Sequence, residues 1–136
     1  MRTVFFYGLF MDSALLVDKG LHPASCEIAS LEGYGLRIGM RATVEKSPTE
    51  RVYGALMSLD RNELQRLYSD ASVADYVAER IVATSLQGAK VPALCYILPQ
   101  TKLSGQNRDY ARSLVTAATA MGLPTEYIRE IETWTR

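Results

Sequence analysis

The stretch Val4-Phe5-Phe6-Tyr7-Gly8-Leu9-Phe10 decides how the start of the chain folds. Its β-branched and aromatic residues predict a buried strand over Arg2–Phe6. Gly8 interrupts this run, and a residue without Cβ lets the backbone approach another group closely. Apolar Leu9 and Phe10 then follow where polar turn residues are usual. The stretch is therefore either a hydrophobic turn after a buried strand or a loop whose backbone N–H groups face a ligand.

The composition is that of one ordinary globular domain, which we expect to span residues 1–136. Of the 136 residues, 48% are hydrophobic and 22% are charged, with fifteen acidic and fifteen basic side chains that cancel. These charges are dispersed, so we expect no nucleic-acid partner. No apolar run approaches the length of a membrane span, and the apolar run after Arg2 is too short for a signal peptide. We therefore expect a cytoplasmic protein with no membrane partner.

The sequence offers no recognisable metal, redox or phosphate-binding motif. Cys26 and Cys95 are far apart and match no metal or redox spacing, so we interpret them as two buried thiols rather than a disulfide. The single histidine, His22, lies in a loop with glycine and proline and is expected at the surface. Without a second histidine, a His-based metal site or a catalytic triad lacks its usual partners. The residues themselves therefore indicate no metal, redox or phosphate-binding site.

Strands dominate the first hundred residues, and helices close the chain. Strands Cys26–Leu31 and Leu36–Gly39 are predicted on either side of a turn at 33–35. Strands Ala42–Lys46 and Arg51–Leu59 are predicted on either side of a hairpin turn at 47–50. Two more strands, Tyr76–Ser85 and Val91–Leu98, are predicted after the central helix. This order of elements predicts an α+β domain whose mixed sheet curls into a small β-barrel with flanking helices.

The helices are predicted from caps and apolar stripes. One or two turns are expected over Met11–Val17. Asp60 and Glu63 form a capping-box pattern before a short helix whose apolar face ends at Tyr68. A stripe from Tyr110 to Met121 has helical spacing and stops before a glycine and a proline. Thr125 is expected to cap a last helix.

Acid–base chemistry in this sequence falls to carboxylates and tyrosines. Asp70 lies where the chain leaves the central helix, a position at which Asp usually forms a turn. Asp75 is another candidate, whereas Glu79 is expected to face solvent on a strand. Among the eight tyrosines, several are predicted in strands or at their ends, which indicates either an aromatic core or a polar pocket between sheet and loop.

Taken together, these segments resemble the gamma-glutamylcyclotransferase-like superfamily, which includes gamma-glutamylamine cyclotransferases and plant avirulence-induced proteins. The resemblance covers roughly residues 2–100 and depends on the order of its parts. The matching segments are Tyr7-Gly8-Leu9-Phe10-Met11, similar to the family's Tyr-Gly loop; Gly35-Leu36-Arg37; Arg41-Ala42-Thr43; Val52-Tyr53-Gly54-Ala55-Leu56; the helix from Leu59-Asp60 to Leu67; Asp70 before Tyr76; and Tyr96 in a late strand.

The resemblance implies a small mixed barrel and a reaction in which a gamma-glutamyl amine or amide cyclises to 5-oxoproline and releases an amine, without a cofactor. A carboxylate would take a proton from the substrate's α-ammonium and return it to the leaving nitrogen. The family's catalytic Glu falls on Ala71 when counted from Leu67, whereas anchoring on Tyr76 favours Asp70. We expect Asp70 to be the acid–base, because it is the one carboxylate in the segment leaving the helix.

The resemblance also implies the substrate-binding residues, which are Tyr7, Gly8, Leu9, Phe10, Tyr76 and Tyr96. The loop N–H groups would bind the substrate's α-carboxylate or the developing oxyanion. A catalytic Asp70 should point into a cavity floored by this loop, with a pKa that burial raises.

Two other interpretations stay open. One is a non-catalytic member of the same fold that binds a small molecule, because the family Glu is missing and the position after Tyr-Gly is Leu9 rather than a small polar residue. The other is a partner-binding domain with Phe10 and Met11 exposed as an apolar patch. The leaving group and the oligomeric state are not predicted.

Overall fold

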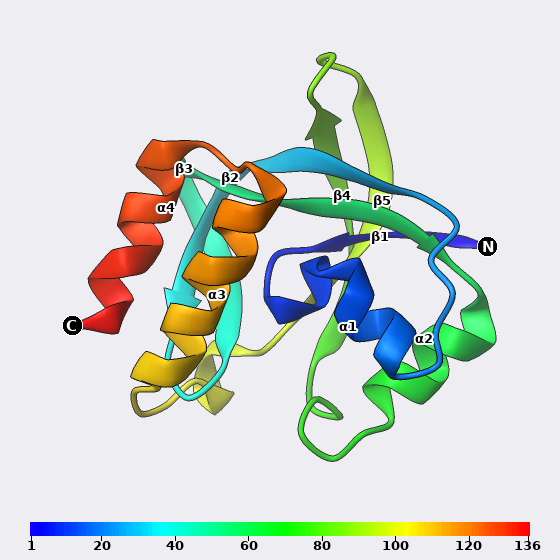
Figure 1. The fold of residues 1–136 in the computed structure, drawn as a ribbon, viewed down its shortest axis with the longest axis horizontal. Coiled ribbons are helices and arrows are strands. Elements are labelled where there is room, and N and C mark those ends of the chain that lie inside the picture. Colours follow the sequence, from blue (N-terminus) through cyan, green and yellow to red (C-terminus); the bar gives the residue numbers. More distant parts are fainter.

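A five-stranded closed barrel forms the centre of the computed structural model, which describes residues 1–136 (Figure 1). The strands follow one another around the barrel in the order β1-β3-β2-β4-β5. Their bounds are β1 Arg2–Phe6, β2 Cys26–Ile38, β3 Ala42–Leu59, β4 Val77–Ser85 and β5 Lys90–Ile97. Neighbours pair antiparallel, except that β1 runs parallel to β5 at Val4↔Leu94 and so closes the barrel. The expected α+β class with a mixed barrel is confirmed.

Strand β1 is buried on both of its faces. Val4, Phe5 and Phe6 are 0%, 1% and 3% exposed, although successive side chains of a strand point to opposite sides. One side therefore fills the barrel and the other is covered by the loop and helices that follow. This two-sided burial explains why the strand reads as a continuous apolar run rather than an alternating one.

The two turns predicted inside the first hundred residues are wrong. Cys26–Ile38 is one strand and Ala42–Leu59 is one strand, and the tight turn between them lies at 39–41. The ladder shifts register where Glu32 pairs with Arg51 and Tyr34 pairs with Lys46, so residues 47–50 bulge opposite one residue of β2. Gly33 and Pro48 lie at this bulge and do not mark hairpin turns. A bulge, like a turn, accommodates residues that cannot join the hydrogen-bond ladder.

Helices flank the barrel on two sides (Figure 1). Their bounds, with the short 3-10 turns, are η1 Leu9–Met11, α1 Ser13–Asp18, α2 Arg61–Tyr68, η2 Gln100–Lys102, α3 Arg108–Met121, α4 Thr125–Glu132 and η3 Thr133–Thr135. Helices α3 and α4 pack together on one side, and α1 lies near α2 on the other. The loop after β1 and η1 lie between these two groups.

The predicted helix signals are largely confirmed. Asp60 and Glu63 form both halves of the capping box of α2. Gly122 ends α3 with a φ of 79°, a left-handed conformation that glycine adopts without steric cost. Two details differ, since α1 begins at Ser13 rather than Met11, and Thr125 is the first residue of α4 while Pro124 occupies the cap position.

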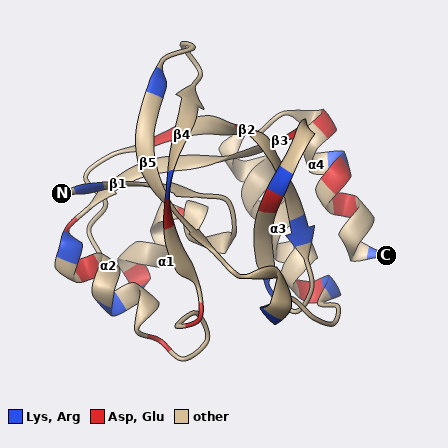
Figure 2. Ribbon diagram, turned by 180° about the vertical axis from the view of Figure 1, so that it is seen from behind, with Lys and Arg blue, Asp and Glu red and all other residues tan.

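Surface features agree with the sequence in part. Both cysteines are free, but Cys26 is exposed, so only Cys95 is a buried thiol. The ring of His22 is 85% exposed, as expected for a loop residue. Acidic and basic residues are interspersed over the strands and helices in Figure 2. No helix has both the length and the apolar composition needed to cross a membrane.

Candidate functional site

An aromatic cavity of about 320 Å³ opens between the loop after β1, the C-terminal end of α2 with the turn that follows it, and the start of α3. Most of its lining is apolar or aromatic. The lining residues are Phe5, Phe6, Tyr7, Gly8, Leu9, Phe10, Leu15, Lys19, Arg41, Ala42, Tyr68, Ser72, Val73, Tyr76, Tyr96 and Tyr110. Such a concave, mainly apolar site with a few polar groups is typical of small-molecule binding.

All six residues expected to bind substrate line this one cavity: Tyr7, Gly8, Leu9, Phe10, Tyr76 and Tyr96. They come from the loop after β1, from the residue before β4 and from β5, which the barrel brings together. Their role in binding stays a prediction. Phe10 lines the cavity and Met11 is only 1% exposed, so these two side chains do not form the exposed apolar patch of the partner-binding interpretation.

Tyr68, the last residue of α2, is the centre of the aromatic lining. Its ring stacks on that of Tyr96 with centroids 3.7 Å apart and an interplanar angle of 6°. Phe10 meets Tyr68 edge-on at 6.0 Å, and Tyr76 lies 6.3 Å away at a tilt. The edge-on pair of Phe10 and Tyr68 is favourable beyond the area it buries, whereas the Tyr68 and Tyr96 rings lie nearly face to face. Tyr68 therefore connects the loop, the turn and β5 into one wall.

Two cavity tyrosines use their hydroxyls to fix the surrounding backbone. Tyr7 donates to the carbonyl of Tyr96 at 2.7 Å, and Tyr76 donates to the carbonyl of Ala42 at 2.6 Å. Burial is the largest cause that raises the pKa of both hydroxyls. Both therefore stay protonated at neutral pH and position the cavity walls rather than acting as bases.

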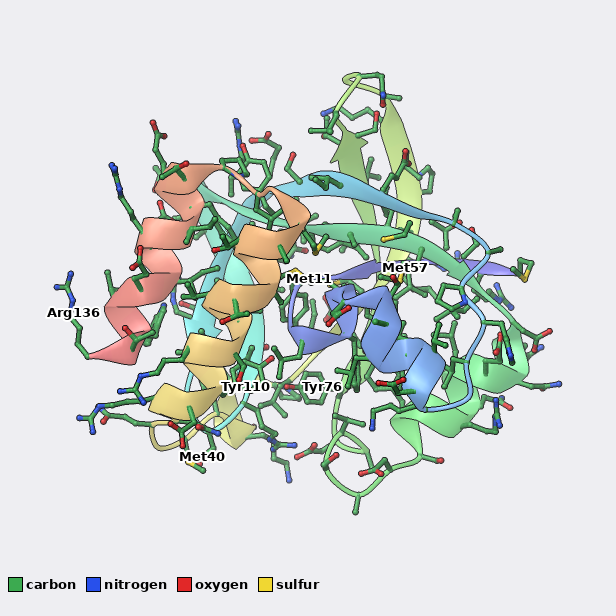
Figure 3. All side chains as sticks on the ribbon, viewed as in Figure 1. Met11, Met40, Met57, Tyr76, Tyr110 and Arg136 are labelled. Atoms are coloured by element: carbon green, nitrogen blue, oxygen red, sulfur yellow. The ribbon has the colours of Figure 1, made fainter.

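Gly8 lets helix α3 close the cavity. A Cβ at this position would lie 2.6 Å from the Tyr110 hydroxyl oxygen, closer than side chains pack. That same oxygen accepts a long hydrogen bond of 3.4 Å from the Leu9 N–H. Figure 3 shows Tyr110 coming from α3 and Tyr76 from the turn before β4, below η1. The close approach of Tyr110 thus favours glycine at this position.

The charged residues of the lining are both basic, Lys19 and Arg41. Arg41 donates to both carboxylate oxygens of Asp75, at 2.6 and 2.9 Å, and to the carbonyl of Ser72 at 2.9 Å. It also lies over the ring of Tyr76, 5.7 Å from the centroid. Arg41 therefore ties the turn after α2 to the β2–β3 connection, and Asp75 compensates its charge. Lys19 forms no ion pair.

Asp70 lies outside the lining of the cavity and is exposed. Its Oδ1 atom accepts hydrogen bonds from the Ser72 hydroxyl at 2.7 Å and the Ser72 N–H at 2.9 Å, which makes it a turn former. These bonds, the hydroxyl's first, lower the pKa of Asp70. The expected burial and raised pKa are therefore wrong, while the acid–base role itself stays a prediction.

Several residues that complete the cavity are not predicted as site residues from the sequence, chiefly Lys19, Arg41, Tyr68 and Tyr110. The sequence pattern indicates only that Tyr68 and Tyr110 belong to apolar helix faces. One signal was available: a tyrosine at the end of such a face carries a hydroxyl that needs a polar partner or solvent. Lys19 and Arg41 carried no such signal, since their place at the cavity depends on the packing of α1 and of the β2–β3 connection. No three His, Cys, Asp or Glu side chains lie close enough together to hold a metal ion.

Comparison with known proteins decides the family. Residues 51–131 match the AIG2-like family, and this span runs from the second half of β3 through α2, the cavity turn, β4, β5 and α3 into α4. The chain belongs to the AIG2-like family. This confirms the resemblance to the gamma-glutamylcyclotransferase-like superfamily. No curated protein sequence matches the chain.

Solved structures show the same fold as this AIG2-like protein at low sequence identity. An uncharacterised human protein superposes with a TM-score of 0.79 and 18% identity, covering 98% of this chain and 87% of the other. A gamma-glutamyl cyclotransferase superposes with a TM-score of 0.78 and 18% identity, covering 98% of this chain and 87% of the other. The glutathione-specific gamma-glutamyl cyclotransferase of yeast superposes with a TM-score of 0.67 and 12% identity, covering 98% of this chain and 95% of the other.

Proposed function

We propose that this AIG2-like protein binds a small organic molecule in the aromatic cavity and does so without an acid–base carboxylate. One observation supports this most strongly: none of the sixteen lining residues is Asp or Glu. The cavity thus has the shape and the aromatic walls for binding, but lacks the group that the cyclisation chemistry needs.

The chemistry of cyclisation explains why the missing carboxylate matters. The α-ammonium of a gamma-glutamyl substrate must lose a proton before its nitrogen attacks the γ-carbonyl. The base must lie within about 2.6–3.2 Å of that proton's donor or one water away. Asp70 is exposed and engaged by Ser72, and the pKa shift makes it a weaker base than an ordinary Asp. The cavity tyrosines are protonated at neutral pH because burial raises their pKa.

A second candidate is a gamma-glutamyl cyclotransferase, a transferase or lyase that releases 5-oxoproline with Asp70 as general acid–base. Ser72 and Val73 favour it, because they line the cavity and belong to the same turn as Asp70. A rearrangement of this turn would be needed to bring the carboxylate inward. In this candidate the loop of Tyr7 and Gly8 binds the substrate's α-carboxylate, and the Gly8 N–H has no partner within the chain.

One experiment separates the two candidates. The pure protein is incubated with a set of gamma-glutamyl amines and amino acids, and both thermal stabilisation and 5-oxoproline release are measured. Asp70→Asn is compared with Asp109→Asn, a control at an exposed position on α3. Stabilisation without 5-oxoproline supports binding alone. Turnover that disappears only in Asp70→Asn supports the cyclotransferase, and turnover retained in Asp70→Asn excludes Asp70 as its acid–base.

A further inference from the structure

We infer that the cavity selects small organic acids that have an apolar or aromatic body and carry no ammonium group. This inference rests on the proposed binding function and names its ligand class. It follows from three properties of the lining: its charge, its hydrogen-bond donors and its aromatic walls.

The charge of the lining is positive and cannot compensate an ammonium group. No lining residue is acidic, and the nearest carboxylates are engaged elsewhere: Asp75 by Arg41 and Asp70 by Ser72. Lys19 forms no ion pair within the chain, although its charge helps to lower the pKa of Asp70, so its ammonium group can still pair with a ligand anion. Moving an ammonium group from water into such a cavity costs free energy that no lining carboxylate offsets and that contact with the tyrosine rings offsets only in part, whereas a carboxylate gains a cation.

Three hydrogen-bond donors of the lining have no acceptor within the chain. The Gly8 N–H has no acceptor within the chain. The Tyr110 hydroxyl accepts from Leu9 but donates to no group, and the Tyr68 hydroxyl forms no hydrogen bond. Ionised carboxylates accept only, and hydrogen bonds to a charged acceptor are stronger than neutral ones. Ammonium groups only donate, so they leave these three donors without an acceptor.

The aromatic walls define the body of the ligand. The stacked pair of Tyr68 and Tyr96 and the edge-on ring of Phe10 present flat apolar surface to a cavity of about 320 Å³. This volume is at the small end of ligand sites, which limits the body to about one ring or a short aliphatic chain. A single free lysine suits a monoanion better than a multiply charged phosphate.

Four matched compounds test the inference by isothermal titration calorimetry. They share a phenyl body and are 3-phenylpropanoate, phenylalanine, 3-phenylpropanamide and 3-phenylpropylamine. We expect 3-phenylpropanoate to bind about tenfold or more tightly than phenylalanine, which differs only by the α-ammonium group. The amide should bind more weakly than the acid, and the amine most weakly.

Lys19→Met tests the source of the selectivity, with Lys46→Met as a matched control on an exposed part of β3 outside the lining. We expect Lys19→Met to weaken 3-phenylpropanoate binding about three- to tenfold, as for an exposed ion pair, and to leave the amide unchanged. Lys46→Met should change neither.

The outcomes separate this inference from the proposed function. If phenylalanine binds as tightly as 3-phenylpropanoate, the acid selectivity is wrong, although the cavity still binds small molecules. If Lys19→Met and Lys46→Met lose equal affinity for 3-phenylpropanoate, the acid selectivity is also wrong. Binding of gamma-glutamyl amines without binding of 3-phenylpropanoate overturns the inference and leaves the proposed function in place. If no compound of either series binds, both are wrong.

Discussion

The contact between Gly8 and Tyr110 gives a sharp prediction about stability. In Gly8→Ala the new Cβ would lie 2.6 Å from the Tyr110 hydroxyl oxygen, so the tyrosine must move and its bond from the Leu9 N–H is strained. Overpacking of this kind costs about 1–3 kcal/mol. The backbone of Gly8 itself accepts alanine, with φ −101° and ψ −156°. Reduced freedom of the unfolded chain then returns about 0.4–1 kcal/mol, and we expect a net loss of about 1–2 kcal/mol.

Removing the Tyr110 hydroxyl should remove the cost of the alanine. In Tyr110→Phe the nearest remaining atom, the ring Cζ, lies 4.0 Å from the Cβ position, which is ordinary contact. Tyr110→Phe alone should cost about 0.5–1 kcal/mol, because the 3.4 Å bond from Leu9 is long. Gly8→Ala added to Tyr110→Phe should then be neutral or slightly stabilising, which gives a coupling energy of about 1–3 kcal/mol.

Urea unfolding of the four proteins in this cycle measures the coupling. Tyr127→Phe serves as the control background, because it removes a buried hydroxyl that has no hydrogen-bond partner and does not contact Gly8. Gly8→Ala should cost the same in that background as in the wild type. If its cost is unchanged in Tyr110→Phe as well, the tyrosine hydroxyl is not the reason for glycine at this position.

Three further predictions concern the turn and the tyrosines. Asp70→Asn should change the free energy of unfolding by less than about 0.5 kcal/mol, because an amide oxygen can still accept from Ser72. The same variant should leave ligand affinity unchanged, and a loss of affinity in titration calorimetry would contradict this. Arg41→Gln should cost about 1 kcal/mol and speed hydrogen exchange of the amides at 70–76, since it removes the bidentate pair with Asp75; unchanged exchange would show that this pair does not hold the turn. Burial raises the pKa of Tyr110 from 10.0 to about 12, so its contribution to stability is complete below pH 10 and is lost as the pH rises through 12. The free energy of unfolding should fall by up to about 1.4 kcal/mol per pH unit for each such tyrosine, and tyrosinate absorbance should appear together with unfolding rather than before it.

The fold was predictable where one local pattern determines the structure. The run of Val4 to Phe6, the capping box at Asp60 and the glycine at 122 each correspond to a single physical requirement, and the structure meets each one. The long β2–β3 hairpin was not predictable in the same way. A glycine or proline inside a strand has the same sequence appearance in a bulge and in a turn, and only long-range pairing with the partner strand distinguishes them.

The site was predictable for the residues that the family resemblance supplied. The loop at Tyr7 to Phe10 and the tyrosines at 76 and 96 do line one cavity. The orientation of Asp70 was not predictable, because the choice between facing the cavity and capping its own turn depends on Ser72 two residues later. Lys19 and Arg41 were missed because their positions depend on how distant elements pack.

We propose the aromatic cavity as the ligand site of this AIG2-like protein. A crystal structure grown with 3-phenylpropanoate tests it most directly. We expect the phenyl ring to lie against Tyr68 and Tyr96, the carboxylate to lie near Lys19, and Asp70 to stay turned toward Ser72. A ligand bound elsewhere would contradict the cavity as the ligand site, and an Asp70 carboxylate turned into the cavity beside the ligand would contradict a site without an acid–base carboxylate.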